Sequence, residues 1–156
     1  MEYTALLHDI GRVISYPGHH KHGWYIIKHA NLIGFSTAEI DIIAAGIVCH
    51  RGMNPGRANV YVQGISKKNR RIVRLLAGIL RVSDSLDRQH NQTVRKVEVV
   101  QEKKHRVSLL IHADQPAMIP LRAAVERAGL LAKALKLRNL DFRLDSPLAK
   151  SVEPAV

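Results

Sequence analysis

The stretch LLHDIGRVISYPGHHKHGWYII, residues 6–27, constrains the fold and the chemistry of this chain more than any other. Residues 8–22 within it contain four histidines and one aspartate. Imidazole and carboxylate groups supply the nitrogen and oxygen ligands that suit zinc, iron, manganese or nickel. His8 and Asp9 are adjacent and cannot share one face of a helix, so they converge only near a helix end, which Gly11 can provide. The stretch therefore predicts a candidate metal centre where helices begin or end.

Residues 1 to about 90 are predicted to form a helical bundle, because their apolar side chains recur at helical spacing. In the second helix these side chains are Trp24, Ile27, Ala30 and Ile33, and Gly34 stops the pattern. The sequence Ser36-Thr37-Ala38-Glu39 is a capping box that opens a third helix. The inward stripe of that helix ends in His50, which follows Ile47 by three residues.

The longest helix is predicted from about Lys68 to Leu86. Its buried side is expected to contain Ile72, Leu75, Leu76, Ile79, Leu80 and Val82. Asp84 follows Leu80 by four residues on the same face, where a carboxylate needs a partner or a ligand. The same carboxylate can also act as a cap or pair with Arg88.

The pattern changes near Asn91. Val97 and Val99 alternate with charged neighbours, and a second alternating run follows a turn at residues 102–104, so a β-hairpin is predicted. A helix from Leu121 to Leu135 and a third strand at residues 140–144 complete a β-β-α-β annex over residues 91–145. The tail, residues 146–156, is expected to be loose. The predicted fold is mainly α, and α+β overall, with a helical core at residues 1–90.

The chain has 156 residues, a single cysteine and a formal net charge of +11. This length suits one domain with a small appendage, and the lone Cys49 fits a reducing cytoplasm. No apolar run is long enough to span a membrane and no signal peptide is visible, so a cytoplasmic location is expected. The excess of Lys and Arg favours polyanionic partners: polyphosphate, a phosphate-containing small molecule or, less strongly, RNA. A basic surface without a partner explains the charge about as well.

Five metal-capable groups are predicted at helix ends or on inward faces, and we expect them to gather in one pocket: His8, Asp9, His22, His50 and Asp84. An inward histidine can equally be a core residue that only bonds its neighbours. The other histidines are assigned to such structural or surface positions: His29, His90, His105 and His112, with His19 facing solvent and His20 left open. The candidate phosphate-binding residues are Lys21, Arg51, Arg70, Arg71, Arg74 and Arg88.

Four segments of the sequence resemble one known family. They are LLHDIGRVISYPGHHKHGWYII, GFSTAEIDIIA at residues 34–44, CHRG at residues 49–52 followed by a proline, and LLAGILRVSDSLDRQH at residues 75–90. Over roughly residues 4 to 145, the chain is similar to the C-terminal HD-type domain of the exopolyphosphatase and guanosine pentaphosphate phosphatase family. The HD superfamily consists of metal-dependent phosphohydrolases, so the resemblance implies a helical HD-type fold.

The resemblance places the HD pair of the superfamily on His8 and Asp9 and its late aspartate on Asp84. His22 and His50 resemble the extra histidines of two-metal HD enzymes, whose second pair reads His-His where this chain has His50-Arg51. HD enzymes also carry a first histidine upstream of the HD pair, and this chain is expected to begin after it. The resemblance thus implies a partial or vestigial metal site for a divalent ion (Mn, Ni, Zn, Fe or Mg), or no bound metal.

Two functions follow from the resemblance. In the family, polyphosphatase activity belongs to an N-terminal actin-like ATPase-fold domain, which this sequence lacks, and the C-terminal module holds the polyanion and forms the dimer. The first hypothesis is a module that binds polyphosphate or a related polyanion and pairs with a second copy or with that N-terminal domain. The alternative is a stand-alone metal-dependent phosphohydrolase of phosphate esters or anhydrides, with Asp9 in the catalytic role. Whether the isolated chain is an enzyme, a fragment or a complete protein stays open.

Overall fold

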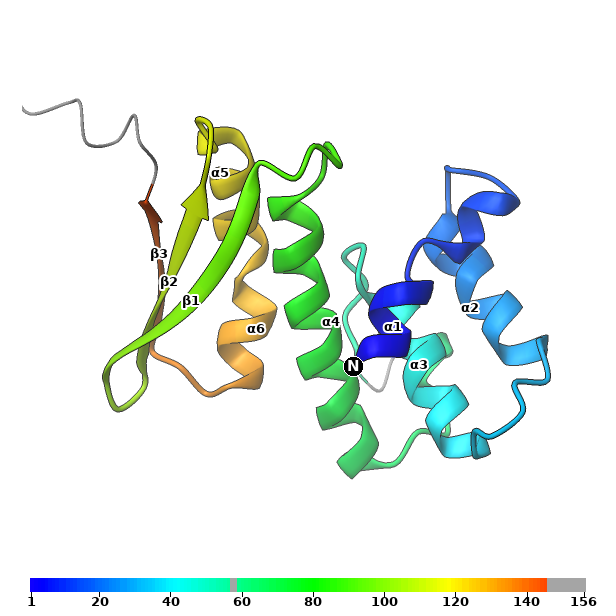
Figure 1. Cartoon of the computed structure of the whole chain (residues 1–156). Helices are drawn as coiled ribbons and strands as arrows, with labels where there is room; N and C mark the ends of the chain where they lie inside the picture. The colour runs from blue at the N-terminus through cyan, green and yellow to red at the C-terminus, as the bar shows by residue number, and fades with distance from the viewer. Residues whose placement is uncertain (57–58, 146–156) are drawn as a thin grey trace, which may run out of the picture. The chain divides into compact units, whose positions relative to one another are not determined.

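Helices dominate the computed structural model, which describes residues 1–56 and 59–145 and, for residues 101–103, the backbone alone. The chain divides into two compact units, and the division falls inside helix α4 (Lys67–Leu86) (Figure 1). The first unit comprises residues 1–81, and the second begins at residue 82. The predicted fold class, mainly helical with a small sheet, is confirmed. The predicted loose tail lies outside the described residues.

Helix α3 (Thr37–Cys49) is the buried centre of the first unit. It begins with the predicted capping box: the Ser36 hydroxyl accepts from the Glu39 amide (3.3 Å), and the Glu39 carboxylate accepts from the Ser36 amide (2.8 Å). Every residue from Ile43 to His50 is buried. The remaining elements of this unit are α1 (Glu2–Leu7), the 3-10 helix η1 (Ile10–Val13), α2 (His19–His29), the 3-10 helix η2 (Val60–Val62) and the first part of α4.

The backbones of η1 and α2 touch at two glycines. A Cβ atom added to Gly11 would lie 1.9 Å from the carbonyl oxygen of His19 and 2.4 Å from the nitrogen of Gly23. No side chain fits into such a contact, so glycine is required here. The contact fixes the segment that carries His8 and Asp9 against the start of α2.

Two predicted apolar stripes differ from the structure. Helix α2 ends at His29, and Asn31 adopts a positive φ of 45°, so Ile33 lies beyond the helix and is 93% exposed. In α4 the buried stripe runs through Val73, Leu76, Ala77 and Leu80. Ile72 is one position, about 100° of helix rotation, away from Val73 and is 40% exposed. The prediction that Ile33 belongs to the second helix and the prediction that Ile72 is buried were therefore wrong.

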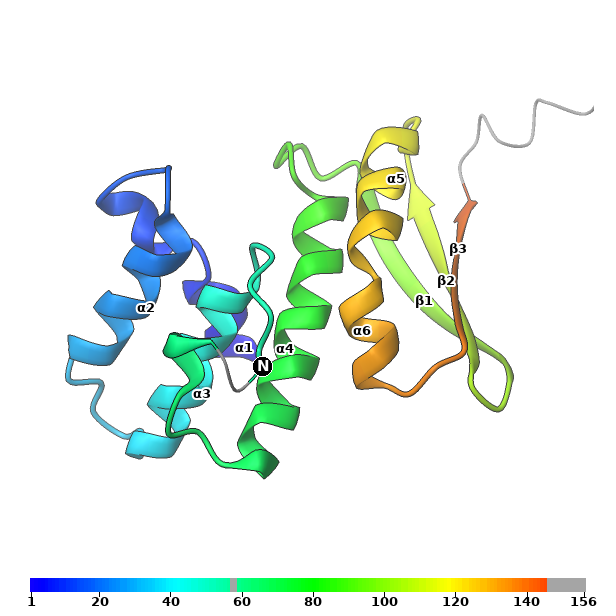
Figure 2. The same ribbon diagram turned by 180° about the vertical axis from the view of Figure 1, so that it is seen from behind.

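The second unit contains the predicted β-β-α-β arrangement. Its elements after α4 are β1 (Val94–Lys103), β2 (Arg106–Ala113), α5 (Met118–Arg127), α6 (Gly129–Ala134) and β3 (Asn139–Asp145). The sheet order is β1-β2-β3, with β1 antiparallel and β3 parallel to β2. The parallel pairing starts at Arg106 and Asn139, and the α5–α6 crossover makes it possible. Figure 2 shows α5 and α6 along one face of this sheet.

Candidate metal centre

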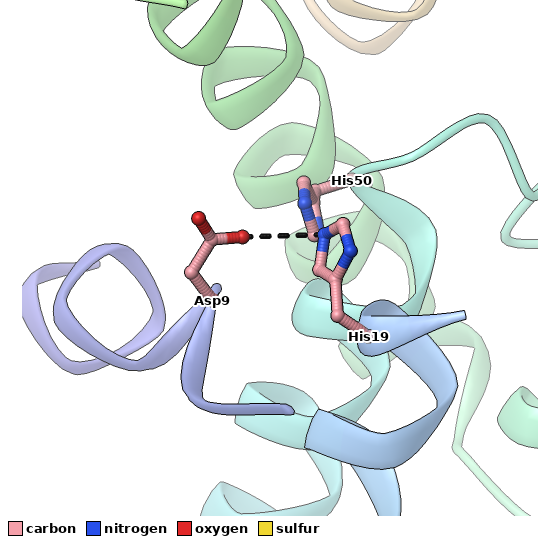
Figure 3. Close-up of side chains that lie close together, drawn as sticks. All are labelled: Asp9, His19 and His50. Carbon is pink, nitrogen blue, oxygen red and sulfur yellow. Dashed lines mark ion pairs between the residues drawn. The ribbon is translucent and has the colours of Figure 1, made fainter. Parts of the chain in front are cut away.

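Three metal-capable side chains of the first unit converge: Asp9, His19 and His50. Their ligand atoms all lie within 4.8 Å of one another (Figure 3). Asp9 precedes η1, His19 is the first residue of α2, and His50 caps the end of α3. We call these three residues the histidine cluster. It is built from helix termini, the kind of position predicted for a metal centre.

Backbone carbonyls orient the imidazole rings around the cluster. The Nδ1 atom of His19 donates to the Tyr16 carbonyl (2.8 Å), and that of His50 donates to the Ile47 carbonyl (2.5 Å). The same contact, three residues back along the chain, joins His8 Nδ1 to the Ala5 carbonyl at 2.6 Å. A carbonyl only accepts, so each Nδ1 carries a proton, and in the neutral ring Nε2 then presents a lone pair. Metal-binding histidines are commonly oriented by a hydrogen bond of this kind.

Like His50, which is 1% exposed, His19 is buried, at 2% exposed. Its Nε2 lies 3.2 Å from Asp9 Oδ1 and makes no hydrogen bond with any residue that the structure describes. A buried polar atom without a hydrogen bond is costly. A divalent cation between the ring nitrogen and the carboxylate would satisfy both, so the donor set fits a metal ion.

The electrostatics of Asp9 favour its ionised form. Partial burial raises its pKa, but the Arg12 hydrogen bond (2.9 Å) and electrostatic interactions with His8, His19 and Arg12 lower it more. The net result is a pKa below the ordinary value. A carboxylate must be deprotonated to bind a metal, so this environment suits a ligand.

The five predicted metal residues are distributed as follows. Asp9 and His50 belong to the histidine cluster, and the His8 ring packs edge-on against His50 with centroids 5.3 Å apart. His22 lies near Gly18, and its buried Nδ1 has no hydrogen-bond partner in the described part of the chain. Asp84 belongs to the second unit, where it pairs with Arg127 (3.5 Å). The ligand role of all five stays a prediction.

The prediction that His19 faces solvent was wrong. The three buried residues of α2 are His19, Gly23 and Ile27, which follow one another by four residues. Extending the stripe back from Ile27 through Gly23 would have identified His19 from the sequence. The interpretation overlooked it because glycine carries no apolar side chain to mark the stripe.

A second feature of the first unit is a basic groove. Pro55, Gly56, Lys67, Arg70, Arg71 and Arg74 line a cavity of about 380 Å³, which we call the α4 groove. Residues 1–81 contain eleven Lys and Arg but four Asp and Glu, and no acidic residue occurs from 42 to 83. Within the described ranges, none of the four groove cations forms an ion pair with a carboxylate.

The other predicted phosphate-binding residues do not line the α4 groove. Lys21 is exposed on α2, and Arg51 is partly exposed with its guanidinium carbon 5.9 Å from the centre of the Tyr16 ring. Arg88 is exposed in the second unit.

In the part of the chain that the structure describes, no helix combines the length and the apolar character needed to cross a membrane.

Comparison with known proteins identifies relatives of the sequence. The family model for Ppx/GppA phosphatase, domain III, matches residues 1–136. A guanosine-5'-triphosphate,3'-diphosphate pyrophosphatase of Pseudoalteromonas atlantica is 36% identical over 81 residues, which are 51% of this chain and 15% of that protein. A protein of the same name from Pseudoalteromonas translucida is 45% identical over 48 residues, which are 31% of this chain and 10% of that protein. The matches thus span only a small part of these curated relatives.

Proposed function

This chain belongs to the Ppx/GppA phosphatase family as its domain III, and on that basis we propose that it binds polyphosphate or a related polyanion through the α4 groove. The observation that carries this proposal is the set of four cationic side chains, Lys67, Arg70, Arg71 and Arg74, that line one cavity. A linear polyphosphate carries a charge on every unit, so it can contact several of them at once.

The physical basis is counterion release. Each phosphate that a Lys or Arg side chain neutralises frees a condensed counterion, which makes affinity fall with the logarithm of salt concentration. In the second unit, several Lys and Arg side chains already pair with carboxylates, as Arg95 does with Asp114. The groove cations have no such intramolecular competitor among the described residues, so they are available to an external anion.

A salt titration of polyphosphate affinity tests the proposal. We compare the parent with the triple variant Lys67→Gln, Arg71→Gln, Arg74→Gln, which spares Arg70 because its guanidinium donates to the Ile65 carbonyl. The variant should lose affinity, and its salt slope should flatten by roughly two units at about 0.7 per lost contact. The matched control replaces three exposed cations of the second unit, Lys133, Lys136 and Arg138, with Gln. Equal slopes in the parent and the groove variant would remove the α4 groove from the binding surface.

The histidine cluster supports a second candidate function, metal-dependent hydrolysis of a phosphate ester or anhydride. Asp9, His19 and His50 would hold the divalent ion, and Arg12 would keep Asp9 ionised and in place. Such an ion lowers the pKa of a bound water and polarises a phosphoryl oxygen. Asp9 would bind the ion or position the attacking water.

Calorimetric titration of the chelator-stripped chain with Zn²⁺, Mn²⁺ or Ni²⁺ tests this site without an activity assay. His19→Gln should weaken binding roughly tenfold or more, because it removes a ligand from a three-residue set. His29→Gln is the matched control, since His29 is an exposed residue of the same helix. Asp84→Asn should leave the affinity unchanged. A loss in Asp84→Asn with none in His19→Gln would instead favour the ligand set that includes Asp84.

We also propose that the first unit presents an association surface. Leu6, Val13 and Ile14 are large apolar side chains, and each is more than half exposed. Exposed apolar side chains on neighbouring segments favour contact with another chain. Light scattering should detect a dimer that Leu6→Glu dissociates, and a monomeric parent at high concentration would contradict the proposal.

A further inference from the structure

Tyr16 joins two guanidinium groups to the histidine cluster. The Cζ atom of Arg12 lies 5.3 Å from the centre of the Tyr16 ring, and that of Arg51 lies 5.9 Å from it. The Tyr16 ring also packs against His19, with centroids 5.4 Å apart and an angle of 32° between the rings. Two arginines that are distant in the sequence therefore meet at one aromatic side chain beside a buried imidazole.

The surroundings of this ring are strongly positive. Arg12 donates a hydrogen bond to Asp9, which is the one acidic residue between positions 3 and 38. Arg51 forms no ion pair with any carboxylate that the structure describes. One carboxylate thus faces several cationic groups, and the imbalance favours an external anion.

We propose that Arg12, Tyr16 and Arg51 form a binding site for a single phosphoryl group, separate from the α4 groove. A guanidinium presents a planar fork of donors that matches two oxygens of a phosphate. Cation–π contact with the Tyr16 ring holds each guanidinium near that ring, which lowers the entropy lost when an anion orders them. A terminal phosphate of a chain, a phosphate monoester and free orthophosphate share the chemistry that this site recognises.

The proposed site requires neither the groove nor a bound metal. Arg12 and Arg51 each lie against the Tyr16 ring, and none of these three residues lines the α4 groove. The α4 groove would hold the middle of a long polyanion through spaced charges. The Tyr16 site would instead hold one tetrahedral group that presents at least two free oxygens. The two sites therefore differ in which ligand saturates them.

The experiment is an NMR titration of ¹⁵N-labelled protein with orthophosphate, in the presence of a chelator and at constant ionic strength. In the parent, the side-chain Nε–H signals of Arg12 and Arg51 should shift and saturate. Arg51→Gln should weaken the affinity by roughly tenfold or more, since it removes a charge-assisted pair. Arg51→Lys should weaken it less, because the charge remains while the fork is lost. Tyr16→Leu keeps every charge and should still weaken binding.

Arg71→Gln is the matched control, since it removes one exposed arginine from the α4 groove. It should leave orthophosphate affinity unchanged while reducing affinity for long-chain polyphosphate. Unchanged orthophosphate binding in Arg51→Gln would overturn the proposal, and so would an equal loss in Arg71→Gln. A loss in Arg51→Gln and Tyr16→Leu alone, with melting temperatures like that of the parent, would establish the site even if the groove binds nothing.

Discussion

Among the described residues, each unit contains a group of histidine and carboxylate side chains, and the two groups have opposite compositions. In the first unit, one carboxylate, Asp9, faces the buried rings of His19 and His50. In the second, one imidazole, His112, lies between two carboxylates: its Nε2 is 3.1 Å from Glu98 and its Nδ1 is 3.0 Å from Asp145. We call Glu98, His112 and Asp145 the sheet cluster.

The two clusters differ in the groups that surround their ring nitrogens, so the number of histidines alone does not indicate where a metal can bind. In the sheet cluster each ring nitrogen of His112 lies within 3.1 Å of a carboxylate, Glu98 on β1 and Asp145 on β3. In the histidine cluster, Nδ1 of each ring donates a hydrogen bond to a backbone carbonyl. Nε2 of His19 faces Asp9 without a hydrogen bond to a described residue. The histidine cluster offers two imidazoles and one carboxylate to a cation, whereas the sheet cluster links β2 to β1 and β3 through one imidazole.

Gly11→Ala should have the largest effect, because it should disrupt the histidine cluster while leaving the sheet cluster intact. The new Cβ would overlap the His19 carbonyl oxygen, so the backbones of η1 and α2 must separate, at a cost of roughly 3 kcal/mol. Urea denaturation should show this loss, and calorimetry should show weaker metal binding. Gly129→Ala is the control, since open space surrounds that position and the change should be close to neutral. A Gly11→Ala variant of unchanged stability would contradict the close contact.

An intermediate effect is expected from His112→Gln, which sharpens the contrast between the clusters. The variant removes the imidazole between Glu98 and Asp145, and the free energy of unfolding should fall by less than in Gly11→Ala because the pairs are partly exposed. Metal affinity should stay at the parent value, in contrast to His19→Gln. A loss of metal binding in His112→Gln would mean that the sheet cluster, too, holds an ion.

The smallest effect concerns acid stability. Hydrogen bonds from Lys96 and His112 hold the pKa of Glu98 below its ordinary value of 4.5. A carboxyl with a lowered pKa in the folded state stabilises the fold at higher pH, and this contribution is lost as the pH falls below that ordinary value. Glu98→Gln should therefore reduce the slope of stability against pH in the acid range. Urea midpoints between pH 3 and pH 6 measure that slope, and parallel curves for parent and variant would refute the effect.

Much of the fold was predictable because local rules dominate it. The capping box at Ser36, the long helix at the end of the first unit and the alternation around Leu109 and Ile111 each follow from spacing alone. The misplaced residues, Ile33 and Ile72, lie where a helix ends early or at the border of a stripe. The spacing of apolar residues identifies the buried face of a helix only to within one residue. It therefore cannot decide whether a residue at the edge of that face is buried.

The candidate site was predictable only in part, for a different reason. Asp9 and His50 were identified because each stands at a recognisable helix end. His19 was missed because Gly23, the next position of its buried stripe, carries no apolar side chain to mark that stripe. Asp84 belongs to the second unit, where its partner is Arg127, a residue more than forty positions later that spacing along one helix does not indicate.

The parallel pairing of β2 and β3 has a consequence for the order of folding. The β1–β2 hairpin closes through the short turn at Lys104 and His105, whereas Asn139 must return across both crossover helices to meet Arg106. Closing the longer loop costs more entropy, so β3 should join the sheet last and leave it first. The contact between His112 and Asp145, at the C-terminal end of β3, should therefore form late in folding. In hydrogen exchange, the β3 amides should therefore be the first of this sheet to lose protection.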